Sequence, residues 1–144
     1  MSDTGPSSNT YNRPLPVKQP ESDFYWEKAQ EHELWLRKCN ACGKAHFYPR
    51  AICPYCYSRD VAWVQATGKG TLHTFAIVER GPTPPFRDHV PYIAGLVDLE
   101  EGPRMPTNIV EIDPESTDLK IGMAVEVTFD DVTDEVTLPK FRPV

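Results

Sequence analysis

The chain has 144 residues, a formal net charge of −6 and 25% charged residues. This length allows one ordinary domain, or a small module joined to a compact domain of about 80 to 90 residues. No apolar run approaches the roughly 18 residues that a membrane span requires, and the N-terminus shows no targeting pattern, so we expect a cytoplasmic protein with no membrane association. The acidic balance argues against a general nucleic-acid binder.

Residues 1–20 contain four prolines and no apolar period, which predicts a flexible tail. From residue 21 to 36 the composition changes, and Ser22 or Asp23 is a suitable N-cap, so a helix is predicted there. The predicted helix has more aromatic residues than one narrow buried stripe on its surface can hold. They either pack on the rest of the protein or form a surface for a partner or ligand.

The spacing of the cysteines predicts one metal site. Cys39, Cys42, Cys53 and Cys56 form the pattern CxxC-x10-CxxC and are the only cysteines in the chain. Each pair can place two thiolates on one tetrahedral zinc ion at the tip of a turn, whereas disulfides would need an oxidising compartment. Residues 37–60 are therefore predicted to form a zinc ribbon. The zinc is structural, because so short a segment cannot bury a core of its own.

The ribbon is locally basic. Between residues 37 and 59 the sequence has five cations and no acid, although the whole chain is acidic. A zinc ion with four thiolates has a net charge of −2, so a surplus of about +3 is left, which could hold a phosphate-bearing ligand. His46 also lies here, but four thiolates complete the coordination. We therefore expect His46 to lie at the surface or beside the metal ligands without binding the metal.

Residues 61–144 are predicted to form a β domain. Strand character is found at 61–67, 71–79, 92–99, 107–112, 125–130 and 136–138. Asp113, Pro114 and Gly122 predict a short helical turn over 113–122, with the proline at its first position and the glycine at its end. The five stretches from residue 71 onward, with one short helix after the third of them, have the order typical of an OB-fold barrel. The predicted fold class is thus mainly β.

The loop over residues 81–91 is unusual because it contains four prolines together with Phe86, Arg87 and His89. Prolines reduce the entropy of a free loop, so this segment could present its side chains in a fixed shape to a ligand or partner. A stiff connector is the equally acceptable alternative.

Nothing in the sequence supports catalysis by the isolated chain. All four cysteines are assigned to the metal, whose complete thiolate set leaves no open coordination position. The four histidines have no serine or carboxylate at a recognisable motif spacing. We therefore expect no catalytic residue in this chain.

Several short motifs together resemble the rubredoxin-like zinc-ribbon plus OB-fold family, long known as a domain of unknown function. The resemblance covers about residues 21–143. It is carried by the knuckles with Phe47-Tyr48-Pro49-Arg50 and Cys53-Pro54, then by Gly68-x-Gly70-Thr71, Phe75-x-Ile77-Val78-x-Arg80, Pro84-Pro85-Phe86, Gly102-Pro103-Arg104 and Leu138-Pro139-Lys140-Phe141-Arg142-Pro143. Tyr57 departs from the family pattern, which has glycine there, and a tyrosine at this place is expected to need a positive φ.

The resemblance implies a function in acyl-CoA metabolism. Members of the family that this sequence resembles act as small acyl-CoA-associated partners of thiolases, of thiolase-like aldolases and of acyl-CoA hydratases. We therefore expect a non-catalytic accessory subunit of a thiolase-type acyl-CoA acyltransferase complex, with an aldolase or hydratase as alternative partner.

Coenzyme A needs cations for its phosphates, a flat surface for adenine and an apolar slot for pantetheine. The residues that offer these groups, and that could equally contact the partner, are Phe75, Arg80, Phe86, Arg87, Tyr92, Arg104, Lys140, Phe141 and Arg142.

Two other classes stay open. A zinc ribbon with an OB barrel also occurs in proteins that bind single-stranded nucleic acid, although the strands here are acidic and no basic stripe is visible. A rubredoxin-like iron protein that carries electrons is the third possibility, but ten residues between the knuckles is a short gap for it. Metal analysis and a salt-dependent binding assay would separate these classes.

Overall fold

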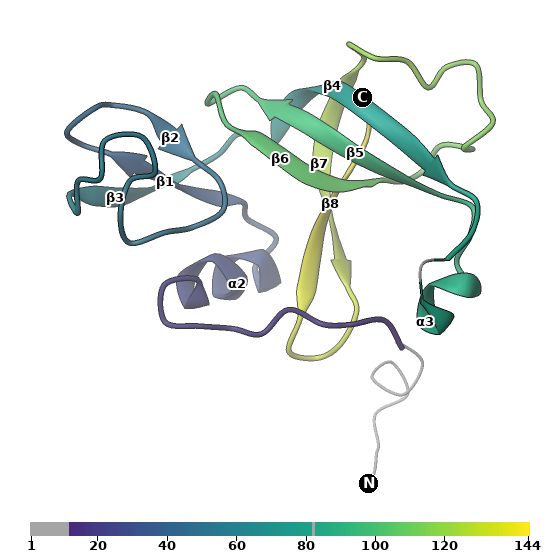
Figure 1. The fold of residues 1–144 in the computed structure, drawn as a ribbon, viewed down its shortest axis with the longest axis horizontal. Coiled ribbons are helices and arrows are strands. Elements are labelled where there is room, and N and C mark those ends of the chain that lie inside the picture. The colour runs from purple at the N-terminus through teal and green to yellow at the C-terminus, as the bar shows by residue number, and fades with distance from the viewer. Residues whose placement is uncertain (1–11, 82) are drawn as a thin grey trace, which may run out of the picture.

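The computed structural model describes residues 12–81 and 83–144, so the first eleven residues of the predicted tail lie outside the described chain. It consists of a three-stranded sheet and a closed five-stranded barrel, with helix α2 (Asp23–Gln30) on one side of both (Figure 1). The predicted fold class, mainly β with an N-terminal helix, a four-cysteine ribbon and an OB-type barrel, is confirmed. Among the described helices, none is long and apolar enough to cross a membrane.

The small sheet carries the cysteines. Its strands, in the order β2-β1-β3, are β1 (Trp35–Cys39), β2 (Ala45–His46) and β3 (Val61–Gln65). The prediction placed residues 61–65 in the barrel domain, but β3 pairs antiparallel with β1, with Val61 opposite Cys39. An alternating strand pattern shows which face is buried and not which sheet the strand joins.

The barrel has the strand order of an OB fold. Its neighbours run β4-β5-β6-β8-β7, and the β6–β8 pair is parallel while the others are antiparallel. The strands are β4 (Lys69–Val78), β5 (Tyr92–Leu99), β6 (Arg104–Ile109), β7 (Ala124–Asp131) and β8 (Thr137–Pro143). Alternate residues of β5 point inward, and Ile93, Val97 and Phe141 are at most 1% exposed.

Helix α2 is shorter than the predicted range 21–36. It ends at Gln30, His32 takes a positive φ of 62°, and Trp35 and Leu36 already belong to β1. The sequence gives no glycine or proline that marks this end, and apolar residues continue beyond it, so the pattern could not show where the helix stops.

Helix α2 joins the two units. The buried side chains of Tyr25, Trp26 and Ala29 face the ribbon and the barrel, and α2 contacts both β1 and β8. The indole Nε1 of Trp26 donates to the Tyr48 hydroxyl at 3.1 Å, and the Gln30 amide donates to the Asp134 carbonyl at 3.2 Å. The aromatic residues of the predicted helix therefore pack internally.

The short helix of the barrel lies elsewhere than predicted. Residues 113–122 form turns instead of a helix, with the Asp113 carboxylate accepting from the Glu115 backbone N–H at 2.9 Å. The short helix is α3 (Pro84–Arg87), inside the proline-rich loop. Proline favours the first position of a helix because its φ is already helical. This signal is present at both Pro84 and Pro114, so it could not show which of the two begins a helix.

Candidate functional site

The four cysteines form one cluster at the tips of the ribbon. Their sulfur atoms all lie within 4.8 Å of one another. The Sγ atoms of Cys39 and Cys56 are 3.6 Å apart, and those of Cys42 and Cys53 are 3.7 Å apart. A tetrahedral zinc ion with Zn–S bonds of about 2.3 Å needs sulfur atoms about 3.8 Å apart. The donor set and its spacing thus fit a structural zinc ion.

The two knuckles repeat the same hydrogen bonds. The Gly43 N–H donates to the Cys39 carbonyl and the Tyr57 N–H donates to the Cys53 carbonyl, each at 2.9 Å. Gly43 and Tyr57 have φ values of 78° and 65°, so the expected positive φ at Tyr57 is confirmed. A turn that glycine adopts freely is thus formed by tyrosine in the second knuckle.

Backbone groups favour the thiolate form needed for metal binding. The Cys42 N–H donates to the Cys39 sulfur at 3.4 Å, and this bond is the main reason that the pKa of Cys39 is lowered to about 7. Cys39 and Cys53 are buried, whereas Cys42 and Cys56 are exposed. His46 is buried within the ribbon, which excludes the expected surface position, and burial lowers its pKa.

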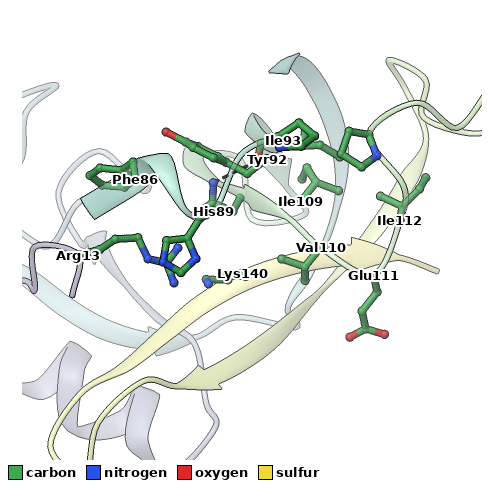
Figure 2. Close-up of a pocket in the computed structure, with 13 residues that line it drawn as sticks. Arg13, Phe86, His89, Tyr92, Ile93, Ile109, Val110, Glu111, Ile112 and Lys140 are labelled. Atoms are coloured by element: carbon green, nitrogen blue, oxygen red, sulfur yellow. Dashed lines mark hydrogen bonds between the residues drawn. The ribbon is translucent and has the colours of Figure 1, made fainter. Parts of the chain in front are cut away.

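A second candidate site is a pocket of about 310 Å³ beside α3. Phe86 and Tyr92 form one wall, with ring centroids 6.1 Å apart. Figure 2 shows nitrogen atoms of Arg13, His89 and Lys140 near one another beside these rings, whereas the Glu111 carboxylate points away. The pocket therefore joins apolar walls to cationic groups, which suits part of a ligand that carries an anionic or carbonyl oxygen.

Lys140 is held in this pocket by an acid. Its Nζ is 2.7 Å from the Asp130 Oδ2, and the residue is 9% exposed. The described N-terminal segment runs from α2 past the β7–β8 hairpin, where Lys18 Nζ donates to the Glu135 carbonyl at 2.6 Å (Figure 1). This path brings Arg13 to the pocket, a contribution that no sequence signal indicated.

The structure brings together only some of the predicted coenzyme A or partner residues. Phe86, Tyr92 and Lys140 line the pocket, and Arg87 is exposed on α3 beside it. Arg80 is exposed just after β4, and Phe75 packs partly buried against the core.

The other three predicted residues make contacts within the barrel. Arg104 Nε is 2.7 Å from the Asp98 carboxylate, and Arg142 contacts Glu126 and Glu111 at 3.0 and 3.3 Å. Phe141 is fully buried, so it cannot touch a cofactor or a partner. Sequence shows the type of these side chains but not their partners or burial.

His32 lies next to an acid and a hydroxyl, but not in the order of a catalytic triad. His32 Nε2 is 3.1 Å from the Asp131 carboxylate, which also accepts a hydrogen bond from the Thr137 hydroxyl. The carboxylate thus lies between the hydroxyl and the imidazole, whereas activation of a hydroxyl needs the imidazole next to it.

The fold and the cysteine cluster define a protein with a structural zinc ribbon and an OB barrel. Two family models agree with this class: "ChsH2, rubredoxin-like zinc ribbon domain" matches residues 26–62, and "ChsH2, C-terminal OB-fold domain" matches residues 63–130. A "DUF35 domain-containing scaffold protein" of Methanothermobacter thermautotrophicus is 37% identical over 107 residues, covering 74% of this chain and 78% of the relative. The chain belongs to this ChsH2 or DUF35 family.

Other relatives come from multi-component enzymes. A "probable enoyl-CoA hydratase alpha subunit" of Thermomonospora curvata is 36% identical over 131 residues, which cover 91% of this chain but only 40% of that subunit's length. A chain of the solved "Ltp2-ChsH2(DUF35) aldolase" has a TM-score of 0.77 and 35% identity, covering 90% of this chain and 98% of that chain. A DUF35 structure from Sulfolobus solfataricus, with a TM-score of 0.60 and 11% identity, shares the fold.

Proposed function

We propose that this chain is a non-catalytic, zinc-stabilised subunit that assembles with a separate catalytic subunit acting on acyl-CoA. The observation that carries this proposal is the likeness to the Ltp2-ChsH2(DUF35) aldolase, which extends over 98% of a chain in that structure. The assignment of all four cysteines to the zinc site supports it, because no thiol is then left to serve as the nucleophile.

The preferred partner is a thiolase-type enzyme that makes or breaks a carbon–carbon bond in an acyl-CoA. Such an enzyme supplies its own nucleophile and base, and no such pair was identified among the described residues of this chain. A hydratase is the second candidate, and the 36% identity to the hydratase alpha subunit favours it. The relative named for aldolase activity aligns over nearly its whole length, whereas the hydratase subunit contains much additional chain.

The pocket beside α3 is the proposed contact with acyl-CoA. Phe86 and Tyr92 offer apolar surface, and the exposed cation of Arg87 lies beside the pocket, while Lys140 lines it with its charge paired to Asp130. A volume of about 310 Å³ is at the small end for ligand pockets, so it would hold one part of the acyl-CoA. The catalytic subunit would hold the reacting thioester.

Single-stranded nucleic acid is a weaker candidate. Such proteins need a groove of free cations with aromatic platforms along the strand. On this barrel, Arg104, Lys140 and Arg142 are each paired with an acid. These cations are therefore already neutralised.

Co-expression tests the proposed function. The chain is produced with a candidate thiolase-type or hydratase-type subunit, sought first among the neighbouring genes, and complexes are isolated by size-exclusion chromatography. We expect a stable complex with the thiolase-type subunit. A complex with the hydratase alone would favour the second candidate, and no complex with either would overturn the proposal.

A further inference from the structure

The second zinc knuckle exposes large apolar side chains. Ile52, Tyr55 and Tyr57 are 38%, 52% and 78% exposed, within six consecutive positions. Together with Arg50 and Arg59 they define what we call the second-knuckle face. Folded proteins usually keep such concentrated aromatic exposure for contacts with another molecule.

Tyr57 is exposed at a conformational cost. Its φ of 65° lies in the left-handed region, which costs free energy for a residue with a side chain. Gly43, the equivalent residue of the first knuckle, adopts a φ of 78° without this cost. Within the described chain the Tyr57 phenol makes no hydrogen bond and no ring contact that could offset this cost. Residues kept in such conformations concentrate at functional sites.

The charge around these aromatic residues has one dominant sign. A shallow hollow of about 490 Å³ is lined by Tyr57, Pro54, Arg50 and Arg59, with Glu21 as its one acid. Neither arginine forms an ion pair with a described residue, and Lys44 Nζ lies 5.1 Å from the centre of the Tyr55 ring. The barrel arginines 104 and 142 are instead neutralised by acids.

We propose that the second-knuckle face docks a protein partner whose surface has an apolar centre and a rim of carboxylates. Tyrosine and arginine are the residue types that most often dominate the binding energy of such interfaces, and the free cations complement an acidic rim. A second copy of this chain is a poor occupant, because the same cations would face each other. The proposal rests on the proposed function, since the partner is the catalytic subunit.

Tyr57→Gly separates docking from folding. Glycine removes the aromatic ring and relieves the positive φ, so the melting temperature and the zinc content should stay at the wild-type values or rise. The Kd between this chain and the catalytic subunit found by co-expression should increase about tenfold or more, which is the usual effect of removing an aromatic residue from the centre of an interface. Tyr55→Ser, at an ordinary backbone position, should act in the same direction.

Arg50→Glu with Arg59→Glu should also weaken the complex and reverse its dependence on salt. Ile121→Ser is the control, because Ile121 is 67% exposed but lies in the loop between β6 and β7 of the barrel, outside the ribbon. It should leave the Kd unchanged.

Wild-type affinity in Tyr57→Gly and Tyr55→Ser would overturn the docking role and leave the proposed function intact. Absence of any wild-type complex would overturn both. A (dT)20 oligonucleotide is measured in parallel: if the variants lose its binding and keep the catalytic subunit, the face binds nucleic acid and the docking role is wrong.

Discussion

The four cysteines could be assigned from sequence because a knuckle fixes its ligands within four consecutive residues. Cys39 Sγ and Cys56 Sγ already lie 3.6 Å apart, close to the edge of a zinc tetrahedron. We expect one zinc ion per purified chain. Cys39→Ser should lose the metal and unfold the ribbon, because ligation supplies its folding energy.

Metal analysis by mass spectrometry and near-ultraviolet circular dichroism measure these two effects. Ser58→Ala is the control, since its side chain lies outside the ligand set. Iron in place of zinc, or a Cys39→Ser variant that stays folded, would contradict the assignment.

Asp131 gives the stability a dependence on pH. The Thr137 hydroxyl and then His32 donate to its carboxylate, and these bonds lower its pKa below the ordinary value of 3.8. A lowered pKa in the folded state contributes stability above pH 3.8, and this contribution is lost as the pH falls through the folded value. Thr137→Val should therefore reduce the melting temperature at pH 7, and the difference from wild type should shrink at low pH.

Thermal denaturation between pH 2.5 and 7 tests this dependence. Thr71→Val, at an exposed position on β4, is the control and should change little. A Thr137→Val difference that stays constant over the whole range would show that Asp131 is not its source.

Two arginines that the sequence suggested as coenzyme A contacts lead to a different prediction. Arg87 is exposed beside the pocket, whereas two acids hold Arg142. Arg87→Ala should raise the KM of the complex for acyl-CoA several-fold with little change in kcat, because a contact remote from the thioester acts alike on ground and transition states. Arg142→Ala, the matched control, should leave KM unchanged. Equal effects in steady-state kinetics would place the ligand elsewhere.

Phe86, Tyr92 and Lys140 were predictable as ligand residue types, and the fold brings them together. The pocket itself was not predictable, because Arg13 reaches it from the N-terminal segment. Phe141 was mistaken for a contact residue because an aromatic residue between two cations resembles a surface motif. In the structure, it is the inward-facing position of a barrel strand.

Among the elements, helix α2 is the one that fixes the ribbon to the barrel. Trp26→Phe removes the 3.1 Å bond to the Tyr48 hydroxyl, so it should lower the free energy of unfolding by about 0.5–1.5 kcal/mol. Trp63→Phe is the control for ring size, since the Trp63 indole donates no hydrogen bond to a described residue. Denaturant unfolding measures both, and an equal loss in the two variants would contradict a role for the bond.

The barrel strands were predictable because their faces alternate, as in β5. The end of α2 and the pairing of β3 were not, because both depend on tertiary contacts that leave no local pattern. The short helix was assigned to residues 113–122 because capping signals also occur in turns.

At the scale of the whole molecule, charge is divided between the two units. The basic ribbon, with no acid from residue 37 to 59, is joined to an acidic barrel. The zinc ribbon and helix α3 lie at opposite ends of the molecule (Figure 1). The second-knuckle face belongs to the ribbon and the other pocket lies beside α3, so a catalytic subunit that used both would have to wrap around the chain or use two copies. The identity of that subunit depends on complementary surfaces, which one sequence cannot show.

The central claim is that this chain supports catalysis without performing it. The direct measurement is acyl-CoA turnover by three samples: the chain alone, the thiolase-type subunit alone and the reconstituted complex. We predict no turnover by the chain alone and a higher kcat/KM for the complex than for the catalytic subunit by itself. Cleavage of a 3-oxoacyl-CoA by the isolated chain, or equal kcat/KM with and without it, would contradict the account.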